Sequence, residues 1–363
     1  MAGFLQNLGL LNFIKEQRII RKKRLIWFIS ALVALLALVP VVAWAHSPQY
    51  PEGNHSLETA YQIKDAAKSW AIYTTLEYPD NSDYYQFTVS SGDKIQISLI
   101  TADNPSSSGF MPSFALLVPG STKRDSIPTY IDIPAGYGAV VRNGSTPAAA
   151  TYEPFSPGWF YELANMTTEA NENGTYYVVV FDNAHKRGNY GLAVGYLEEF
   201  TALEWVMIPY NVHITYIWEG QNLFVTLLPI VLVLIIGGII FYWRNRKGMA
   251  PKGASKWLAA FAGLMFIGTG LSITYQMLLA FNITGATREA VFTSVFIAIS
   301  VVLGIVALLY AVRRKPVLTR WRRVALVAIG LLGLFLWSGL YLGPALIIVA
   351  GLIPPYVLIK SER

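Results

Sequence analysis

Residues 84–100 read YYQFTVSSGDKIQISLI, and this stretch decides the fold of the polar part of the chain. Its first six residues are mostly aromatic or β-branched, which is typical of a strand. Ser91-Gly92-Asp93 then forms a turn signal. From Lys94 to Ile100 polar and apolar residues alternate, as in a strand with one buried face. The stretch therefore predicts two strands joined by a turn.

Three more segments carry the same strand signals: Phe114–Val118, Gly174–Phe181 and Tyr190–Gly195. The second is the strongest, because it runs through two tyrosines, three valines and a phenylalanine. Clusters of Gly, Pro, Asn and Ser separate these segments. Several short strands with such spacing predict an all-β sandwich. We place this domain at residues 46–197.

Four motifs in this block resemble the bacterial pre-peptidase C-terminal domain. They are the opening motif Gly53–Ala60 with Ile63, the central signature Asp83–Asp93, and the closing strands Asn173–Phe181 and Gly188–Val194. The resemblance covers about residues 50–196, roughly two fifths of the chain. It implies a jelly-roll-like β-sandwich that accompanies secreted enzymes or surface proteins as an accessory or binding module.

The chain departs from that family in two respects. A long insert, Pro119–Glu169, is rich in Pro, Gly, Ala and Tyr, and no peptidase is attached. The resemblance therefore implies a fold and leaves the role of the module open.

The rest of the chain is organised by apolar segments. A membrane-spanning helix needs about 20 mostly apolar residues. Five uncharged segments are long enough, namely Leu25–Ala45, Leu223–Trp243, Trp257–Phe281, Ala290–Val312 and Val324–Ile359. The last is too long for one crossing, and Gly343-Pro344 near its middle would break a helix. We therefore expect a hairpin of spans 324–342 and 344–359, and about six spans in an α-helical bundle.

Charge predicts the orientation of these spans. Residues 46–222 hold 19 acidic and 8 basic side chains, a net charge of −11, whereas basic residues gather in segments 15–24, 244–256 and 313–323. Basic loops stay on the cytoplasmic side. We expect a multi-pass plasma-membrane protein with both termini cytoplasmic, a basic tail at 1–24 and an extracellular sandwich. The formal charge of +6 then reflects contact with the lipid bilayer rather than with nucleic acid.

The first span, 25–45, has two interpretations. It is long enough to be an uncleaved signal anchor, but Ala43-Trp44-Ala45 has the small-x-small pattern of a signal-peptidase site. Cleavage there would make His46 the new N-terminus. The chain has no cysteine, which excludes disulfides, thiolate ligands and a cysteine nucleophile and favours a prokaryotic source.

Residues 198–222 form an aromatic juxtamembrane collar in which Trp, Tyr, Ile and Met residues are interspersed with glutamates. Trp and Tyr favour the membrane interface, where both the ring and its polar tip are satisfied. We therefore expect the collar to seat the sandwich on the outer leaflet. The alternative is an aromatic ligand groove.

Oxygen-bearing side chains suggest a calcium site. Asp80, Asn81 and Asp83 share one turn, and Asn54 and Glu58 approach it if the family fold holds. Calcium needs six to eight oxygen ligands, and the resemblance implies such sites in some relatives. The alternative is an Asx-rich turn with solvated carboxylates.

A second metal hypothesis concerns His46. If the signal is cleaved, this residue would offer its amine and its imidazole to copper, as in a histidine brace. A second histidine would be needed, and the others are His55, His185 and His213. The alternative is four scattered surface histidines.

The sequence offers little support for catalysis or transport. It has no Gly-x-Ser-x-Gly elbow, no phosphate-binding loop and no dinucleotide fingerprint. The predicted spans contain no Asp, Glu, Lys, Arg or His, which argues against an ion-coupled carrier. Glycines such as Gly263, Gly268 and Gly270 instead predict close helix packing.

We therefore expect a non-catalytic surface protein without a cofactor, which displays a β-sandwich binding module for an envelope glycan or a surface protein. One alternative is an accessory subunit that docks a membrane protein partner through its spans. Another is an extracellular protein that handles copper or calcium.

Overall fold

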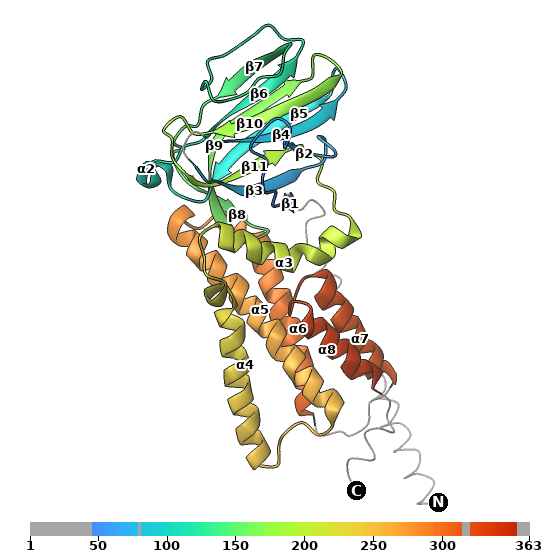
Figure 1. Ribbon diagram of the computed structural model, residues 1–363. Coiled ribbons are helices and arrows are strands. Elements are labelled where there is room, and N and C mark those ends of the chain that lie inside the picture. Colours follow the sequence, from blue (N-terminus) through green and yellow to red (C-terminus); the bar gives the residue numbers. More distant parts are fainter. Residues whose placement is uncertain (1–45, 79–80, 314–319, 354–363) are drawn as a thin grey trace, which may run out of the picture. The chain divides into compact units, whose positions relative to one another are not determined.

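The computed structural model describes residues 46–78, 81–313 and 320–353 (Figure 1). The predicted basic tail, the first span at 25–45 and the end of the last predicted span lie outside the described residues. So does Asp80 of the predicted calcium site. The described chain contains eleven strands followed in sequence by the long helices, with one short helix, α2 (Pro105–Ser108), among the strands.

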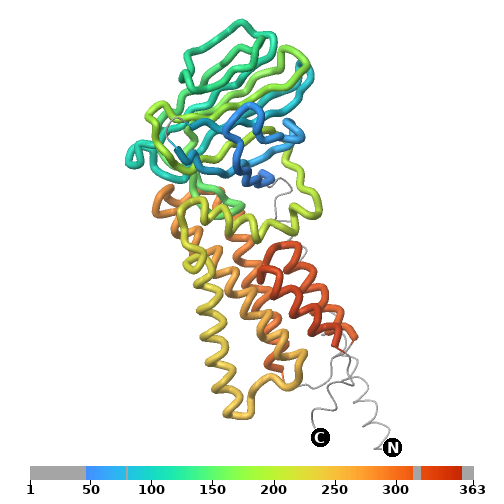
Figure 2. The backbone as a smooth tube through the Cα atoms, viewed as in Figure 1, coloured from blue at the N-terminus to red at the C-terminus, as the bar shows by residue number. Residues whose placement is uncertain are grey.

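Two β-sheets form the N-terminal domain (Figures 1 and 2). The six-stranded sheet has the order β1 (Ser47–Gln49), β3 (Trp70–Leu76), β11 (Gly188–Val194), β5 (Lys94–Thr101), β9 (Gly158–Glu169) and β8 (Thr151–Glu153). The five-stranded sheet has the order β2 (Tyr61–Gln62), β4 (Ser82–Val89), β10 (Gly174–Phe181), β6 (Ser113–Pro119) and β7 (Tyr137–Arg142). The predicted β-sandwich is confirmed.

The two strands of the opening stretch belong to different sheets. β4 pairs with β10, and β5 pairs with β11 and β9. The turn between them therefore carries the chain from one sheet to the other. Gly92 adopts a φ of 89°, and the Asp93 carboxylate accepts a hydrogen bond of 2.7 Å from the Ser90 amide. Only glycine adopts that φ without strain.

Alternating residues of the two sheets form the core. Ile95, Ile97 and Leu99 of β5 are 0–1% exposed, and they pack in one cluster with Val178 and Val180 of β10. Full burial of each such side chain stabilises the fold by about 1.5–3 kcal/mol. The opposite face of β5 carries Lys, Gln and Ser, so the sheet keeps one polar face.

The insert Pro119–Glu169 extends both sheets. It supplies β7 to the five-stranded sheet and β8 and β9 to the six-stranded sheet. Its loop residue Ile131 is buried with Phe181 and Tyr84 in a second cluster on the outer face of the five-stranded sheet. The insert is therefore an integral part of the sandwich.

Six longer helices follow the sandwich: α3 (Ala202–Trp218), α4 (Leu223–Arg246), α5 (Ala254–Thr284), α6 (Ala290–Val312), α7 (Arg320–Phe335) and α8 (Leu342–Leu352). Among the described residues, α4, α5 and α6 are long and apolar enough to cross a membrane, in agreement with three of the predicted spans. The predicted collar contains one regular helix, α3.

The C-terminal apolar stretch bends earlier than the sequence suggests. α7 ends at Phe335, and Trp337 and Leu340 in the connection adopt left-handed φ angles of 53° and 54°. Pro344 lies in the first turn of α8, where its missing N–H costs no intrahelical hydrogen bond. The helix break therefore lies before Gly343-Pro344.

Glycines bring the apolar helices together, as predicted. A Cβ added at Gly263 of α5 would lie 2.9 Å from the carbonyl oxygen of Gly304 in α6, and one at Gly268 would lie 2.9 Å from the Ile230 Cα in α4. Close backbone approach of this kind gives helices strong van der Waals contact within a membrane.

We expect Gly304→Val to destabilise the helical part by about 1–3 kcal/mol, because the added atoms meet α5 backbone. Gly238→Val in α4 is the matched control, since nothing lies within 4 Å of a Cβ there. Thermal unfolding of the detergent-solubilised protein measures both. Equal unfolding temperatures for the two variants would contradict the prediction.

Candidate functional site

Helix α3 begins at a capping box that is tied to the six-stranded sheet. Thr201 accepts a hydrogen bond of 3.2 Å from the Glu204 amide, and the Glu204 carboxylate accepts one of 2.7 Å from the Thr201 amide. The same carboxylate pairs with Lys68, just before β3, at 2.7 Å. The N-terminus of α3 is therefore fixed to the sandwich.

The other end of α3 is held through Trp218. Its indole donates to the Thr74 carbonyl of β3 at 3.1 Å, and its own carbonyl accepts from the Asn189 side chain of β11 at 2.6 Å. Its ring lies 4.8 Å from the ring of Tyr73. α3 is thus attached at both ends to the six-stranded sheet, at Lys68 before β3 and at Thr74 and Asn189 of β3 and β11.

A cavity of about 490 Å³ lies where α3 and the β8–β9 segment meet the six-stranded sheet; we call it the sheet–helix cavity. Its floor includes Ala71, Ala193 and Ser98, which are neighbours in the register of β3, β11 and β5. Three small side chains in one row leave space beneath α3. Ligand sites in proteins commonly have volumes of about 300–1,000 Å³.

Aromatic and polar side chains line the sheet–helix cavity. The aromatic ones are Tyr73, Trp159, Phe160, Tyr196 and Trp218. The uncharged polar ones include Gln96, Ser98 and Ser156, and the ionisable ones include His46, Lys94, Glu153, Glu162, Glu198 and Glu219. Carboxylates therefore outnumber cations around this space.

Burial changes the protonation of two of these carboxyl groups. It raises the pKa of Glu153 to about 7, with a further contribution from nearby Glu198, while the Phe155 amide donates to the carboxylate at 2.9 Å and opposes the shift. Burial likewise raises the pKa of Glu219 to about 8, although a hydrogen bond of 3.0 Å donated by Gln221 acts in the opposite direction and lowers this pKa. Among the described residues neither carboxylate has an ion-pair partner.

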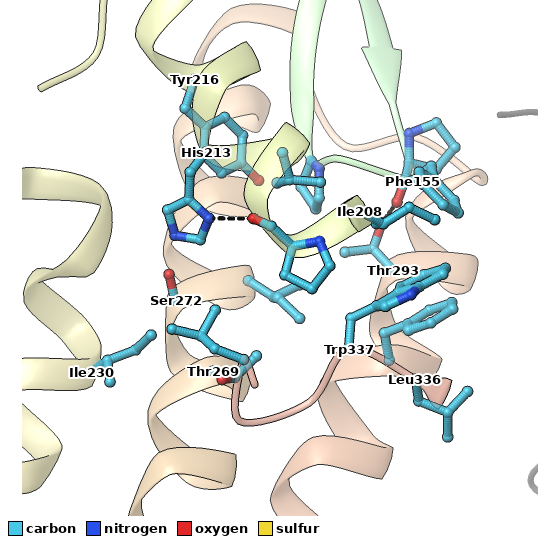
Figure 3. Close-up of a pocket in the computed structure, with 17 residues that line it drawn as sticks. Phe155, Ile208, His213, Tyr216, Ile230, Thr269, Ser272, Thr293, Leu336 and Trp337 are labelled. Carbon is cyan, nitrogen blue, oxygen red and sulfur yellow. Dashed lines mark hydrogen bonds between the residues drawn. The ribbon is translucent and has the colours of Figure 1, made fainter. Parts of the chain in front are cut away.

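A second, smaller pocket of about 80 Å³ lies where α3, the β8–β9 turn and the apolar helices meet (Figure 3); we call it the junction pocket. His213 Nδ1 is 2.7 Å from the Pro209 carbonyl, and therefore carries the proton. His213 Nε2 is buried without a hydrogen-bond partner among the described residues. The remaining lining is mainly apolar, including Ile208, Ile230 and Phe296.

Pro209 also explains how α3 is attached to the α7–α8 connection. Proline lacks an N–H, so it leaves the Trp205 carbonyl without its intrahelical donor. The Trp337 indole donates to that carbonyl at 3.0 Å, and the Trp205 indole donates to the Phe335 carbonyl at 3.0 Å. Tyr341 adds a hydrogen bond of 2.7 Å to the Val206 carbonyl.

The structure distributes the predicted calcium ligands over different environments. Asp83 is fully buried and receives hydrogen bonds from Tyr190 at 2.6 Å and His55 at 2.8 Å, and burial raises its pKa. Asn54 is buried and donates to the Tyr84 carbonyl. Asn81 contacts His55 at 3.3 Å, and Glu58 is exposed. Asp83 and Asn54 thus serve the interior of the sandwich.

His46 lies at the sheet–helix cavity, where its ring is hydrogen-bonded to the Ser69 hydroxyl. His213 lines the junction pocket, and His55 bonds to Asp83. Within residues 46–78, 81–313 and 320–353, no group of three or more His, Cys, Asp or Glu side chains is placed to hold a metal ion.

No family model and no curated protein matches the chain. Among solved structures it is similar to the pre-peptidase C-terminal domain of a collagenase from Bacillus anthracis, with 21% identity over 39% of this chain and 94% of that chain and a TM-score of 0.23. It is also similar to the secreted copper-binding protein MopE of Methylococcus capsulatus, with 11% identity over 32% of this chain and 70% of that chain and a TM-score of 0.16. The first of these structures belongs to the domain family that the sequence motifs resemble.

Proposed function

We propose that this protein is a membrane-anchored surface protein whose β-sandwich binds a ligand outside the cell, and that the ligand occupies the sheet–helix cavity. The observation that carries the proposal is that cavity of about 490 Å³, lined by aromatic and hydrogen-bonding side chains beneath α3. A hollow with a few convergent polar groups is the usual form of a ligand site.

The membrane arrangement that we propose has about six spans, cytoplasmic termini and an extracellular sandwich in the plasma membrane. Arg244 and Arg246 in the last turn of α4 support this orientation under the positive-inside rule. α3 supports it as well, because it exposes an apolar stripe at helical spacing, made of Leu203, Val206, Met207, Tyr210 and Ile217. Such a stripe suits a helix that lies in the surface of the bilayer.

The proposed activity is binding without catalysis or a cofactor, and the proposed ligand is an envelope glycan. Hydroxyl-rich molecules need several hydrogen-bonding partners, which Gln96, Ser98 and Ser156 provide beside the aromatic walls. A surface protein is the alternative ligand, but the cavity lies between α3 and the sheet, where a compact molecule fits better than a protein surface.

We expect Ala193→Phe to abolish retention of the full-length protein, in lipid nanodiscs, on envelope glycan fractions, because the ring fills the cavity floor. Ala184→Phe is the matched control, since Ala184 is exposed in the β10–β11 turn. The control should bind as the wild type does. Unchanged retention of Ala193→Phe, with normal thermal unfolding, would contradict the proposal.

One observation favours a second candidate function, an accessory subunit of a membrane complex. α4 makes its main helix contacts with α5 and leaves large apolar side chains such as Leu228, Ile235 and Ile239 exposed. That face suits lipid or another membrane protein. Purification in mild detergent separates these options, because a lone monomer argues against a stable partner.

A further inference from the structure

We propose that the ligand of the sheet–helix cavity carries a protonated amine, and that Glu153 and Glu219 supply its counter-charge. This inference rests on the proposed function and specifies the chemistry of its ligand. It comes from three features of the cavity: the Glu153 and Glu219 carboxylates, which have no ion-pair partner among the described residues, the aromatic faces beside them, and a polar floor.

The charges around the cavity are unbalanced. Glu153 comes from the end of β8 and Glu219 from the end of α3, and the charge of Glu153 adds to the burial that raises the pKa of Glu219. Glu162 also lines the space, and among the described residues the lysine that lines it is Lys94, whose ammonium lies 4.6 Å from the centre of the Tyr196 ring. Burial lowers the pKa of the remaining basic group, His46, which keeps it neutral.

A buried carboxylate without a cation is costly, and protonation or a cationic ligand relieves that cost. The protein alone uses protonation, as the raised pKa values of Glu153 and Glu219 indicate. An ammonium group between them would let both carboxylates ionise. Charged hydrogen bonds of this kind are about twice as strong as neutral ones.

The aromatic walls add a second attraction for the same group. Tyr73 and Trp218 lie against each other at a centroid distance of 4.8 Å, and both line the cavity with Trp159. A cation over the face of Trp or Tyr is attracted by the negative charge of the ring face. The carboxylates and rings of this cavity therefore favour the same ligand charge.

The geometry favours an organic cation over a metal ion. Calcium requires six to eight converging oxygens, and the described residues contain no cluster of three acidic or histidine side chains able to hold a metal. The cavity is also far larger than one ion requires, at about 490 Å³. Gln96, Ser98 and Ser156 offer hydrogen bonds to a hydroxylated body, so an amine-bearing sugar derivative combines all the required groups.

Three probes with one carbon skeleton test the charge directly: glucamine, sorbitol and gluconate, which are cationic, neutral and anionic. We expect the wild-type protein in nanodiscs at pH 8 to bind glucamine about tenfold more tightly than sorbitol, as one charged hydrogen bond of the usual strength implies. Gluconate should bind most weakly. Tryptophan fluorescence reports binding, because Trp159 and Trp218 line the cavity.

Carboxamide variants identify the counter-charges. Glu153→Gln and Glu219→Gln should each reduce glucamine affinity toward that of sorbitol while leaving sorbitol affinity unchanged. Glu58→Gln, at an exposed position outside the cavity, is the matched control and should behave as the wild type. Equal affinities of the wild type for glucamine and sorbitol would overturn the inference.

Calorimetry provides a second test that needs no variant. Near pH 7 glucamine should release about one to two protons on binding, because Glu153 and Glu219 ionise around it. Titrations in two amine-free buffers of different ionisation enthalpy count these protons, and no release overturns the inference. If envelope fractions still bind and Ala193→Phe abolishes that binding, the proposed function stands even though the amine specificity fails.

Discussion

Tyr190→Phe is expected to destabilise the β-sandwich by about 3 kcal/mol, because it removes one hydroxyl from a buried network. The Tyr190 hydroxyl donates to Asp83 Oδ2 at 2.6 Å and lies 2.6 Å from the Tyr85 hydroxyl. All three residues are 0–1% exposed. Without this hydroxyl the Asp83 carboxyl group keeps, among the described side chains, its hydrogen bond with His55, and the Tyr85 hydroxyl loses its hydrogen bond with Tyr190.

Denaturant unfolding of the full-length protein in detergent, followed by tryptophan fluorescence, measures this loss. Tyr176→Phe is the matched control. Tyr176 is as deeply buried, but its hydroxyl bonds only to backbone groups of Glu172. The free energy of unfolding of the control should fall by about 1 kcal/mol, which is the usual net contribution of a neutral hydrogen bond. If both variants lose the same amount, the Asp83 network has no special role in stability.

The second large effect is a pH-dependent stabilisation by Glu153→Gln combined with Glu219→Gln. In the folded protein burial raises the pKa of Glu153 to about 7 and the pKa of Glu219 to about 8, above the ordinary glutamate value of 4.5. Between pH 4.5 and these values the folded state therefore holds more protons than the unfolded state. Stability that is present at low pH is then lost as the pH rises through that window.

Glutamine resembles the protonated acid and does not titrate, so the double variant should escape this loss. We expect the double variant to have the same free energy of unfolding as the wild type at pH 5, and one that is higher by roughly 3 kcal/mol at pH 9. This value is smaller than the sum expected from the two separate pKa shifts, because the two carboxyl groups interact. Thermal or denaturant unfolding at both pH values measures the difference. Asp83 titrates in both the wild type and the double variant, so its contribution cancels in the difference between their free energies of unfolding.

Glu58→Gln is again the control, because that carboxylate is exposed and its replacement should leave the pH profile unchanged. A double variant that gained as much stability at pH 5 as at pH 9 would contradict the assignment. Such a result would show that packing, rather than ionisation, limits stability at the cavity.

The sequence predicted the local structure well where one periodicity of apolar residues dominates a segment. The alternation in Lys94–Ile100 gave β5 and its buried face, and uncharged apolar runs gave α4, α5 and α6. It did not show that β4 and β5 lie in opposite sheets, because alternation fixes which face is buried and says nothing about the pairing partner. Strand pairing depends on contacts distant in sequence.

The site was harder to predict than the fold. The alternative of an aromatic ligand groove in the collar stays a prediction, and two collar residues, Trp218 and Glu219, line the sheet–helix cavity. The sequence did not indicate that Glu153 lines a cavity, because acidic residues are usually exposed and the insert around Glu153 has no clear hydrophobic periodicity. Neither Ala71 nor Ala193 indicates a cavity in the sequence by itself. The strand register shows that the two small side chains are neighbours on the cavity floor.

The hydrogen bonds around Pro209 have a mechanical consequence. α3 is attached to the sandwich through Glu204 and Trp218 and to the α7–α8 connection through Trp205 and Trp337. Rotation of α3 about its axis would have to break bonds on both sides together. The helix therefore couples the two parts, because a change in its orientation would disturb its contacts with the sandwich and with the C-terminal helix pair at the same time.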